Sequence, residues 1–179
     1  MTPSVRIYPW YGVVSGDEVQ QGDIFESCPV FSPSSTKLDD PDSRSYFDWA
    51  ERDVIVMTQS CDLTKGRTKT EDVLVCALWF GSDFTSGHYL STPKGLEDAR
   101  RGNLPGLHLI GKCEETDFAR TFRVVDFRRT WSLPVPYIRE RAAQTLHLRL
   151  LPPYREHLSQ AFARYFMRVG LPVDIPPFR

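Results

Sequence analysis

Residues 58–62 (TQSCD) are five consecutive polar or reactive residues directly after an apolar run. Strand ends hold side chains at the edge of a cleft, where binding and catalytic groups are common. Cations at positions 65, 67 and 69 follow Cys61, and positive charge near a thiol favours the reactive thiolate. In this interpretation Cys61 is a nucleophile or a redox-sensitive thiol, Asp62 orients it, and Gln59 donates to the substrate.

A structural interpretation of the same segment is also open. Gln59 and Asp62 would then satisfy backbone groups of a turn, and Cys61 would pack as a small apolar side chain. A cysteine nucleophile needs a general base. His88 and His108 are the histidines in the middle of the chain, and neither lies in a recognisable catalytic motif.

Residues 120–131 (RTFRVVDFRRTW) interleave four arginines with three aromatic residues. Arginine binds phosphate and aromatic rings stack on bases, which is the chemistry of a groove for single-stranded nucleic acid. The alternative is an amphipathic strand with its arginines in solvent and its aromatic residues in the core. The predicted nucleic-acid-binding residues are Arg123, Arg128, Arg129 and, in the basic loop 64–70, Lys65 and Arg67.

The four cysteines and four histidines lack the short spacing of structural zinc sites. Walker A, GxGxxG, GxSxG and HExxH motifs are absent, so we expect no metal and no cofactor. The cysteines are scattered, the N-terminus lacks the pattern of a secretory signal, and no apolar stretch reaches about 18 residues. These features predict a soluble cytoplasmic protein with reduced thiols.

The elements that must position these side chains are mainly strands. Apolar, β-rich runs predict strands over 23–31, 53–59, 73–80, 107–110, 120–127 and 145–150. Capping residues and prolines predict short helices over 91–102 and 136–144. Residues 32–45 are polar without periodicity and are predicted to form a long loop.

The clearest element lies near the C-terminus. Apolar residues at positions 158, 161, 162, 165, 166 and 169 follow helical spacing, which predicts an amphipathic helix over about 153–169. The chain has 179 residues, is 41% hydrophobic and carries a net charge of −1, with acidic residues dominant in 1–90 and basic residues in 91–179. We expect a single domain, 1–179, of the α+β class.

Several local phrases, in their order, resemble the MazF/PemK growth-inhibitor family. Residues 21–24 (QGDI) are similar to the RGDI phrase that opens its members, and a long loop then ends at Arg52 before an apolar strand. Residues 124–130 (VVDFRRT) are similar to a later strand followed by RT. The resemblance covers roughly 20–145. It implies a small SH3-like β-barrel over about 20–150 with attached helices.

Family members that cleave RNA use an arginine before the second strand and a hydroxyl residue at the end of the third. Arg52 matches the arginine, but Trp79 occupies the hydroxyl position. The family's general acid–base arrangement is therefore incomplete in this chain. The predicted catalytic residues are Arg52, Gln59, Cys61 and Asp62.

The leading hypothesis is a bacterial toxin- or defence-associated barrel that binds RNA, with cleavage by an endoribonuclease-like reaction left open. Its partners would be RNA or a protein, such as an antitoxin or a defence-complex subunit, with no membrane partner. A homodimer is also left open. One alternative is a non-catalytic protein-interaction module that has lost the nuclease chemistry. Another is a cysteine-dependent enzyme that uses Cys61.

Overall fold

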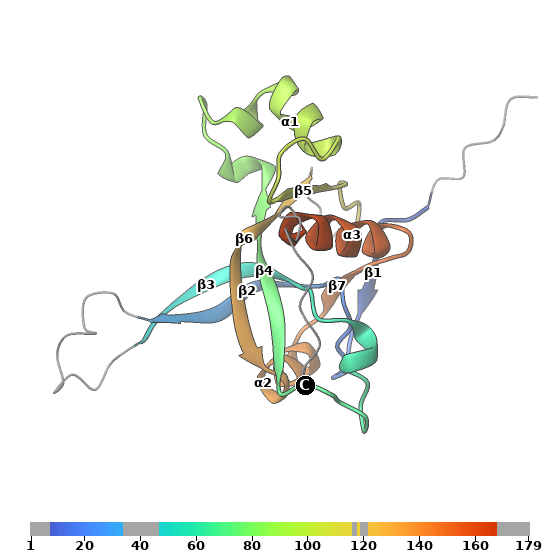
Figure 1. Cartoon of the computed structure of the whole chain (residues 1–179). Helices are drawn as coiled ribbons and strands as arrows, with labels where there is room; N and C mark the ends of the chain where they lie inside the picture. The colour runs from blue at the N-terminus through green and yellow to red at the C-terminus, as the bar shows by residue number, and fades with distance from the viewer. Residues whose placement is uncertain (1–7, 34–46, 116–117, 119–121, 168–179) are drawn as a thin grey trace, which may run out of the picture.

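The protein is described by a computed structural model, which covers residues 8–33, 47–115, 118 and 122–167 (Figure 1). In this part of the chain, seven strands form one antiparallel sheet in the order β1-β7-β2-β3-β4-β6-β5. The strands are β1 (Tyr11–Val14), β2 (Asp23–Pro33), β3 (Phe47–Val56), β4 (Asp72–Phe80), β5 (Leu107–Ile110), β6 (Arg123–Pro134) and β7 (His147–Leu150). The α-helices are α1 (Pro93–Arg100), α2 (Val135–Gln144) and α3 (Tyr154–Phe166).

The central strands are apolar without interruption because both faces of the sheet are covered. In β3, Val54 and Val56 belong to one core cluster, whereas Ile55 belongs to the other. The first cluster packs against α2 through Ile138, and the second packs against α3 through Leu158. Strands buried on both faces read as continuous apolar runs. Full burial of an Ile or Leu side chain stabilises the fold by about 2 kcal/mol.

The helix predicted over 153–169 is observed as α3. Phe162 and Tyr165 lie partly buried against the core, and the rings of Phe162 and Phe127 meet edge to face at 5.3 Å between centroids. The aromatic stripe of this helix therefore packs on the sheet. The predicted helices over 91–102 and 136–144 are observed as α1 and α2.

The α+β class is confirmed, but the described strands do not form a closed barrel. β1 and β5 are the two edges of the sheet, so the closure expected of an SH3-like barrel is not observed. Two contributions to this sheet were not predicted. One is β1, which pairs with β7, and the other is the first half of β3, which extends with β2 as a long hairpin away from the sheet (Figure 1).

Some predicted boundaries shift. The strand predicted over 53–59 ends at Val56, and Ser60–Asp62 form a 3-10 turn instead. The strand predicted over 120–127 starts at Arg123 and continues to Pro134. Most of the predicted loop 32–45 lies outside the described residues, while Ser32 and Pro33 still belong to β2. No helix in the described ranges is long and apolar enough to span a membrane.

Candidate functional site

Two adjoining hollows lie between strands β3, β4 and β6 and the segment that follows β4. The larger has a volume of about 690 Å³ and the smaller about 330 Å³. Trp79 and Asp83 line both hollows, so we treat them as one feature, the Trp79 groove. Arg128 and Arg129 line the larger hollow and Arg52 the smaller one. The groove thus contains three residues predicted from the sequence.

An irregularity in β6 brings its arginines into the groove. Residues 76 and 77 are consecutive in β4, yet they pair with residues 130 and 126 of β6. Residues 127–129 are therefore left out of the ladder with β4. Phe127 turns into the core, whereas Arg128 and Arg129 are exposed. Bulges of this kind re-aim side chains and are frequent beside binding sites.

The two exposed arginines have different partners. Arg128 donates two hydrogen bonds to the Asp126 carboxylate, at 2.7 Å from Nε and 2.9 Å from Nη2. Burial opposes ionisation of Asp126, but hydrogen bonds and the charge of Arg128 prevail and lower the pKa of this carboxyl. Arg129 has no carboxylate partner among the described residues, and its guanidinium lies 5.3 Å from the centre of the Trp79 ring. A guanidinium stacked on an indole keeps its N–H donors available for phosphate.

Arg123, the third predicted arginine of this strand, lies in the core. Its side chain is 0% exposed and donates to Glu26 at 3.0 Å and to the carbonyl of Phe118 at 3.1 Å. The rings of Tyr11 and Phe80 each lie 5.4 Å from its guanidinium carbon. Arg123 therefore joins β2, β6 and the edge of the sheet, and it does not line the Trp79 groove.

A second bulge forms the other wall of the groove. Phe25 and Cys28 of β2 pair with residues 54 and 52 of β3, so two residues, Glu26 and Ser27, stand opposite one. Ser27 has a φ of 48°, and its amide donates to the Asp53 carboxylate at 2.8 Å. A non-glycine residue at positive φ is strained by about 1 kcal/mol or more. The wall that holds Arg52 is thus shaped by a strained bulge.

Aromatic residues that follow β4 complete the groove. Phe84, His88 and Tyr89 line the larger hollow, and the rings of Phe84 and His88 are stacked at 4.9 Å. Nδ1 of His88 accepts a hydrogen bond from the Leu90 amide at 3.1 Å, so the neutral ring carries its proton on Nε2. Sequence reasoning did not identify these residues as part of the groove lining. The signal was the aromatic density of residues 79–89 (WFGSDFTSGHY).

The predicted residues Gln59, Cys61 and Asp62 lie on the 3-10 turn 60–62 and its N-terminal flank, which we call the Cys61 turn. Cys61 is exposed, and its Sγ lies 3.7 Å from Oε1 of Gln59 and 3.6 Å from Oδ1 of Asp62. The cysteine does not pack in the core, unlike Cys28 and Cys76. Burial raises the pKa of the Cys76 thiol to about 12, so that thiol stays protonated.

The other side chains of the Cys61 turn satisfy backbone groups. Ser60 Oγ accepts from the amide of Gln21 at 3.1 Å, and Thr58 Oγ1 accepts from the amide of Leu74 at 2.7 Å. Gln21 in turn donates through Nε2 to the carbonyl of Met57 at 2.8 Å. The structural interpretation assigned this role to Gln59 and Asp62, but in the described residues Thr58 and Ser60 bind the backbone groups instead. Cys61 is exposed and does not pack as that interpretation expected.

The cations near this turn are partly neutralised. Lys65 pairs with Asp17 at 2.7 Å, and Lys69 lies 3.4 Å from the Asp62 carboxylate. Arg67 is exposed on the same loop. Exposed ion pairs such as these contribute little to stability. The three cations nevertheless lie on the short loop that follows Cys61.

The structure separates the predicted catalytic residues into two regions. Arg52 lies in the Trp79 groove, four residues before the end of β3 at Val56, which is about 13 Å along the strand. Gln59, Cys61 and Asp62 follow beyond that end. Within the described ranges, no group of three or more His, Cys, Asp or Glu residues is arranged to hold a metal ion.

No family model matches the chain, and neither the curated proteins nor the solved structures contain a significant match.

Proposed function

We propose that this protein binds single-stranded RNA in the Trp79 groove. The observation that supports this proposal is the guanidinium of Arg129 over the Trp79 ring, with Arg52 lining the smaller hollow that shares this tryptophan. Stacking on an aromatic ring contributes about 1–3 kcal/mol per base. Arg52 and Arg129 would hold the phosphates on either side of a stacked base.

The charges of the groove indicate how such binding would work. Three arginines line it, together with the four carboxylates of Glu51, Asp53, Asp83 and Asp126. The groove is therefore not a broad basic surface, and it would take a short stretch of nucleotides. Its affinity would come mainly from stacking, with about two phosphate contacts. Carboxylates can also accept hydrogen bonds from the N–H groups of base edges.

The test is fluorescence anisotropy with a labelled 12-nucleotide RNA, compared with the same RNA in a duplex. Trp79→Ala should abolish the preference for the single strand. Trp49→Ala is a matched control, because Trp49 is a tryptophan that is 65% exposed on the β2–β3 hairpin. Equal binding by the wild type and the Trp79 variant would contradict the proposal.

Cleavage of the bound RNA and kinship with the MazF/PemK family remain part of the proposal. The position of Arg52 beside the Trp79 groove supports a role at the phosphate. Incubation of RNA with the wild type, Arg52→Ala and Cys61→Ala, followed by gel analysis, distinguishes the cases. Loss of cleavage only in Arg52→Ala would favour a nuclease of the MazF/PemK type. Loss of cleavage only in Cys61→Ala would favour a cysteine-dependent enzyme. Equal background cleavage by the wild type and both variants would mean that the protein binds RNA without cleaving it.

A second candidate function, a protein-interaction module, is favoured by the β2–β3 hairpin. Phe31 pairs directly with Trp49, and Pro33 pairs with Phe47. Phe31 is 51% exposed, and Trp49 and Phe47 are each 65% exposed. Exposed apolar side chains gathered on one hairpin are typical of a protein contact. Loss of a stoichiometric partner with Trp49→Ala, but not with Trp79→Ala, would identify this function.

A further inference from the structure

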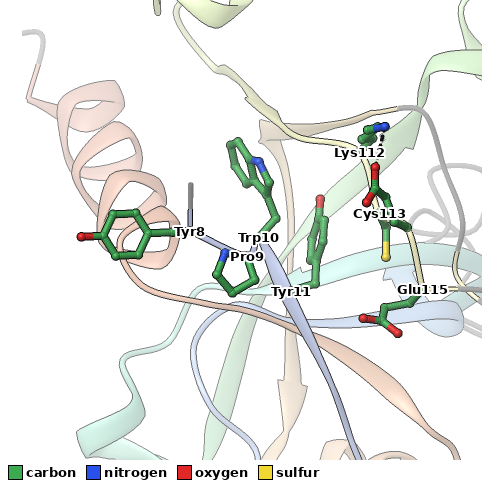
Figure 2. Close-up of a pocket in the computed structure, with 8 residues that line it drawn as sticks. Tyr8, Pro9, Trp10, Tyr11, Lys112, Cys113 and Glu115 are labelled. Atoms are coloured by element: carbon green, nitrogen blue, oxygen red, sulfur yellow. Dashed lines mark ion pairs between the residues drawn. The ribbon is translucent and has the colours of Figure 1, made fainter. Parts of the chain in front are cut away.

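A separate hollow of about 340 Å³ lies between the chain that enters β1 and the segment that follows β5 (Figure 2). Figure 2 shows Trp10 and Tyr11 side by side, with Lys112, Cys113 and Glu115 across from them. None of these residues lines the Trp79 groove. The hollow combines an aromatic wall with a charged wall.

The aromatic wall is held firmly by the fold. Trp10 stacks on Tyr154 with 3.5 Å between ring centroids and 10° between planes. Tyr11 donates its hydroxyl to the carbonyl of Gly111 at 2.6 Å. Burial raises the pKa of Tyr11 to about 12, so the phenol stays protonated and keeps this donor. Each ring thus uses part of its surface for packing while another part lines the hollow.

The position of the charged wall is set by a glycine. A Cβ on Gly111 would lie 2.4 Å from the Trp10 ring, so only glycine lets the segment 112–115 approach this closely. Lys112 pairs with Glu114 at 2.6 Å, which neutralises both charges. Glu115 has no hydrogen bond or ion pair through its side chain among the described residues. The hollow therefore carries one uncompensated negative charge beside aromatic rings.

The buried arginine behind Tyr11 does not reverse this charge. Arg123 is paired with Glu26 at 3.0 Å and has no exposed surface. An anion that entered the hollow would lie beside the uncompensated carboxylate of Glu115. A neutral apolar ligand would leave the exposed Glu115 carboxylate without a partner, whereas a cation would pair with it.

We propose that this hollow binds an organic cation, with an alkylammonium or guanidinium group against Glu115 and its alkyl stem against Trp10 and Tyr11. Aromatic faces attract such cations, and an aliphatic stem packs well on the same rings. The volume suits the end of one side chain or a small amine. The cation can come from an arginine or lysine side chain of a partner polypeptide or from a free polyamine.

The experiment compares N-acetyl-arginine amide with N-acetyl-citrulline amide by ligand-observed NMR titration of the full chain. The two probes have nearly the same shape, but only the first is charged. We expect the arginine probe to bind about tenfold more tightly. A parallel titration with spermidine distinguishes the source, because tighter binding of spermidine would indicate a free polyamine and tighter binding of the arginine probe a side chain.

Glu115→Gln removes the charge with little change of shape and should reduce the affinity for the arginine probe about tenfold. Glu140→Gln, on an exposed position of α2, is the matched control and should leave the affinity unchanged. Thermal unfolding of both variants checks that the fold is intact. Equal affinities for the arginine and citrulline probes, or no saturable binding of any cation, would overturn the proposal.

Discussion

The Trp79 groove and the Cys61 turn are built in opposite ways. The groove draws its walls from β2, β3, β4, β6 and the segment after β4, and bulges in β2 and β6 shape it. The Cys61 turn is formed by consecutive residues, and Gln21 is the distant residue that hydrogen-bonds to Ser60. Reactive residue types are concentrated in the turn. The groove instead holds stacked rings and, among the described residues, two arginines without a carboxylate partner, Arg52 and Arg129. In this protein the most reactive residue types and the concave surface therefore lie in different places.

The largest effect should come from removing the central ring of the groove. Trp79→Ala should weaken binding of single-stranded RNA by about 1–3 kcal/mol, or roughly 5- to 150-fold, because a base loses its stacking surface. Cys61→Ala should leave the affinity unchanged. Anisotropy titrations at one fixed salt concentration measure both variants. The comparison between the two regions fails if Cys61→Ala weakens binding as much as Trp79→Ala.

Acid should loosen the β5 edge of the sheet and its contact with α3 before the Cys61 turn. Burial, and then the nearby charge of His157, lower the pKa of His108 in β5 from 6.5 to about 4. Between these pH values the unfolded chain binds a proton that the folded chain does not, so stability falls as the pH drops below 6.5. The loss is about 2 kcal/mol at pH 5.

Hydrogen exchange at pH 7 and pH 5 tests this acid effect. Amides of β5 and of α3, which contains His157, should lose protection more than those of residues 58–62. His108→Gln should remove most of the pH dependence. A uniform loss of protection across both regions would show that His108 does not account for the difference.

The two arginines of the groove should each change the salt dependence of binding. The logarithm of the association constant for a single strand falls with the logarithm of salt concentration by about 0.7 per phosphate contact. Arg52→Gln and Arg129→Gln should each reduce the slope by about 0.7, and the double variant should have almost no slope. Arg67→Gln, in the loop beside the Cys61 turn, is the matched control. An equal change of slope in that variant would extend the RNA contact to the turn.

A smaller effect is expected from the strained bulge. Ser27→Gly should increase the free energy of unfolding by about 0.5 kcal/mol, because glycine adopts positive φ at lower cost, partly offset by its greater freedom in the unfolded chain. Ser60→Ala should instead lower it by about 1 kcal/mol, since the Gln21 amide loses its acceptor. Urea unfolding measures both. Destabilisation by Ser27→Gly would mean that the serine hydroxyl is needed in the groove wall.

The smallest effect on RNA binding should follow alkylation of Cys61. The exposed thiol should react with iodoacetamide in the folded protein, while Cys28, Cys76 and Cys113 stay protected until the chain unfolds. Mass spectrometry counts the modified thiols before and after denaturation. Singly modified protein should bind RNA with unchanged affinity, and a loss of affinity would bring the Cys61 turn into the binding surface.

Patterns of apolar residues were enough to predict the element types and most of the strands and helices. Continuous apolar runs marked β4 and the second half of β3, and helical spacing marked α3, because these patterns reflect burial of each element's own side chains. The sequence also singled out Arg128 and Arg129, since arginines between aromatic residues are visible without a fold, and Arg52 through the resemblance to the MazF/PemK family.

Which of those side chains share a surface depends on strand pairing, which the local sequence does not reveal. The bulges in β2 and β6 have no local signature, because they depend on how one strand pairs with its neighbour. For that reason Arg123 and Arg129, six residues apart in one strand, lie respectively in the core and over Trp79. The open sheet and the hollow beside Trp10 likewise arise from contacts between residues 100 or more positions apart.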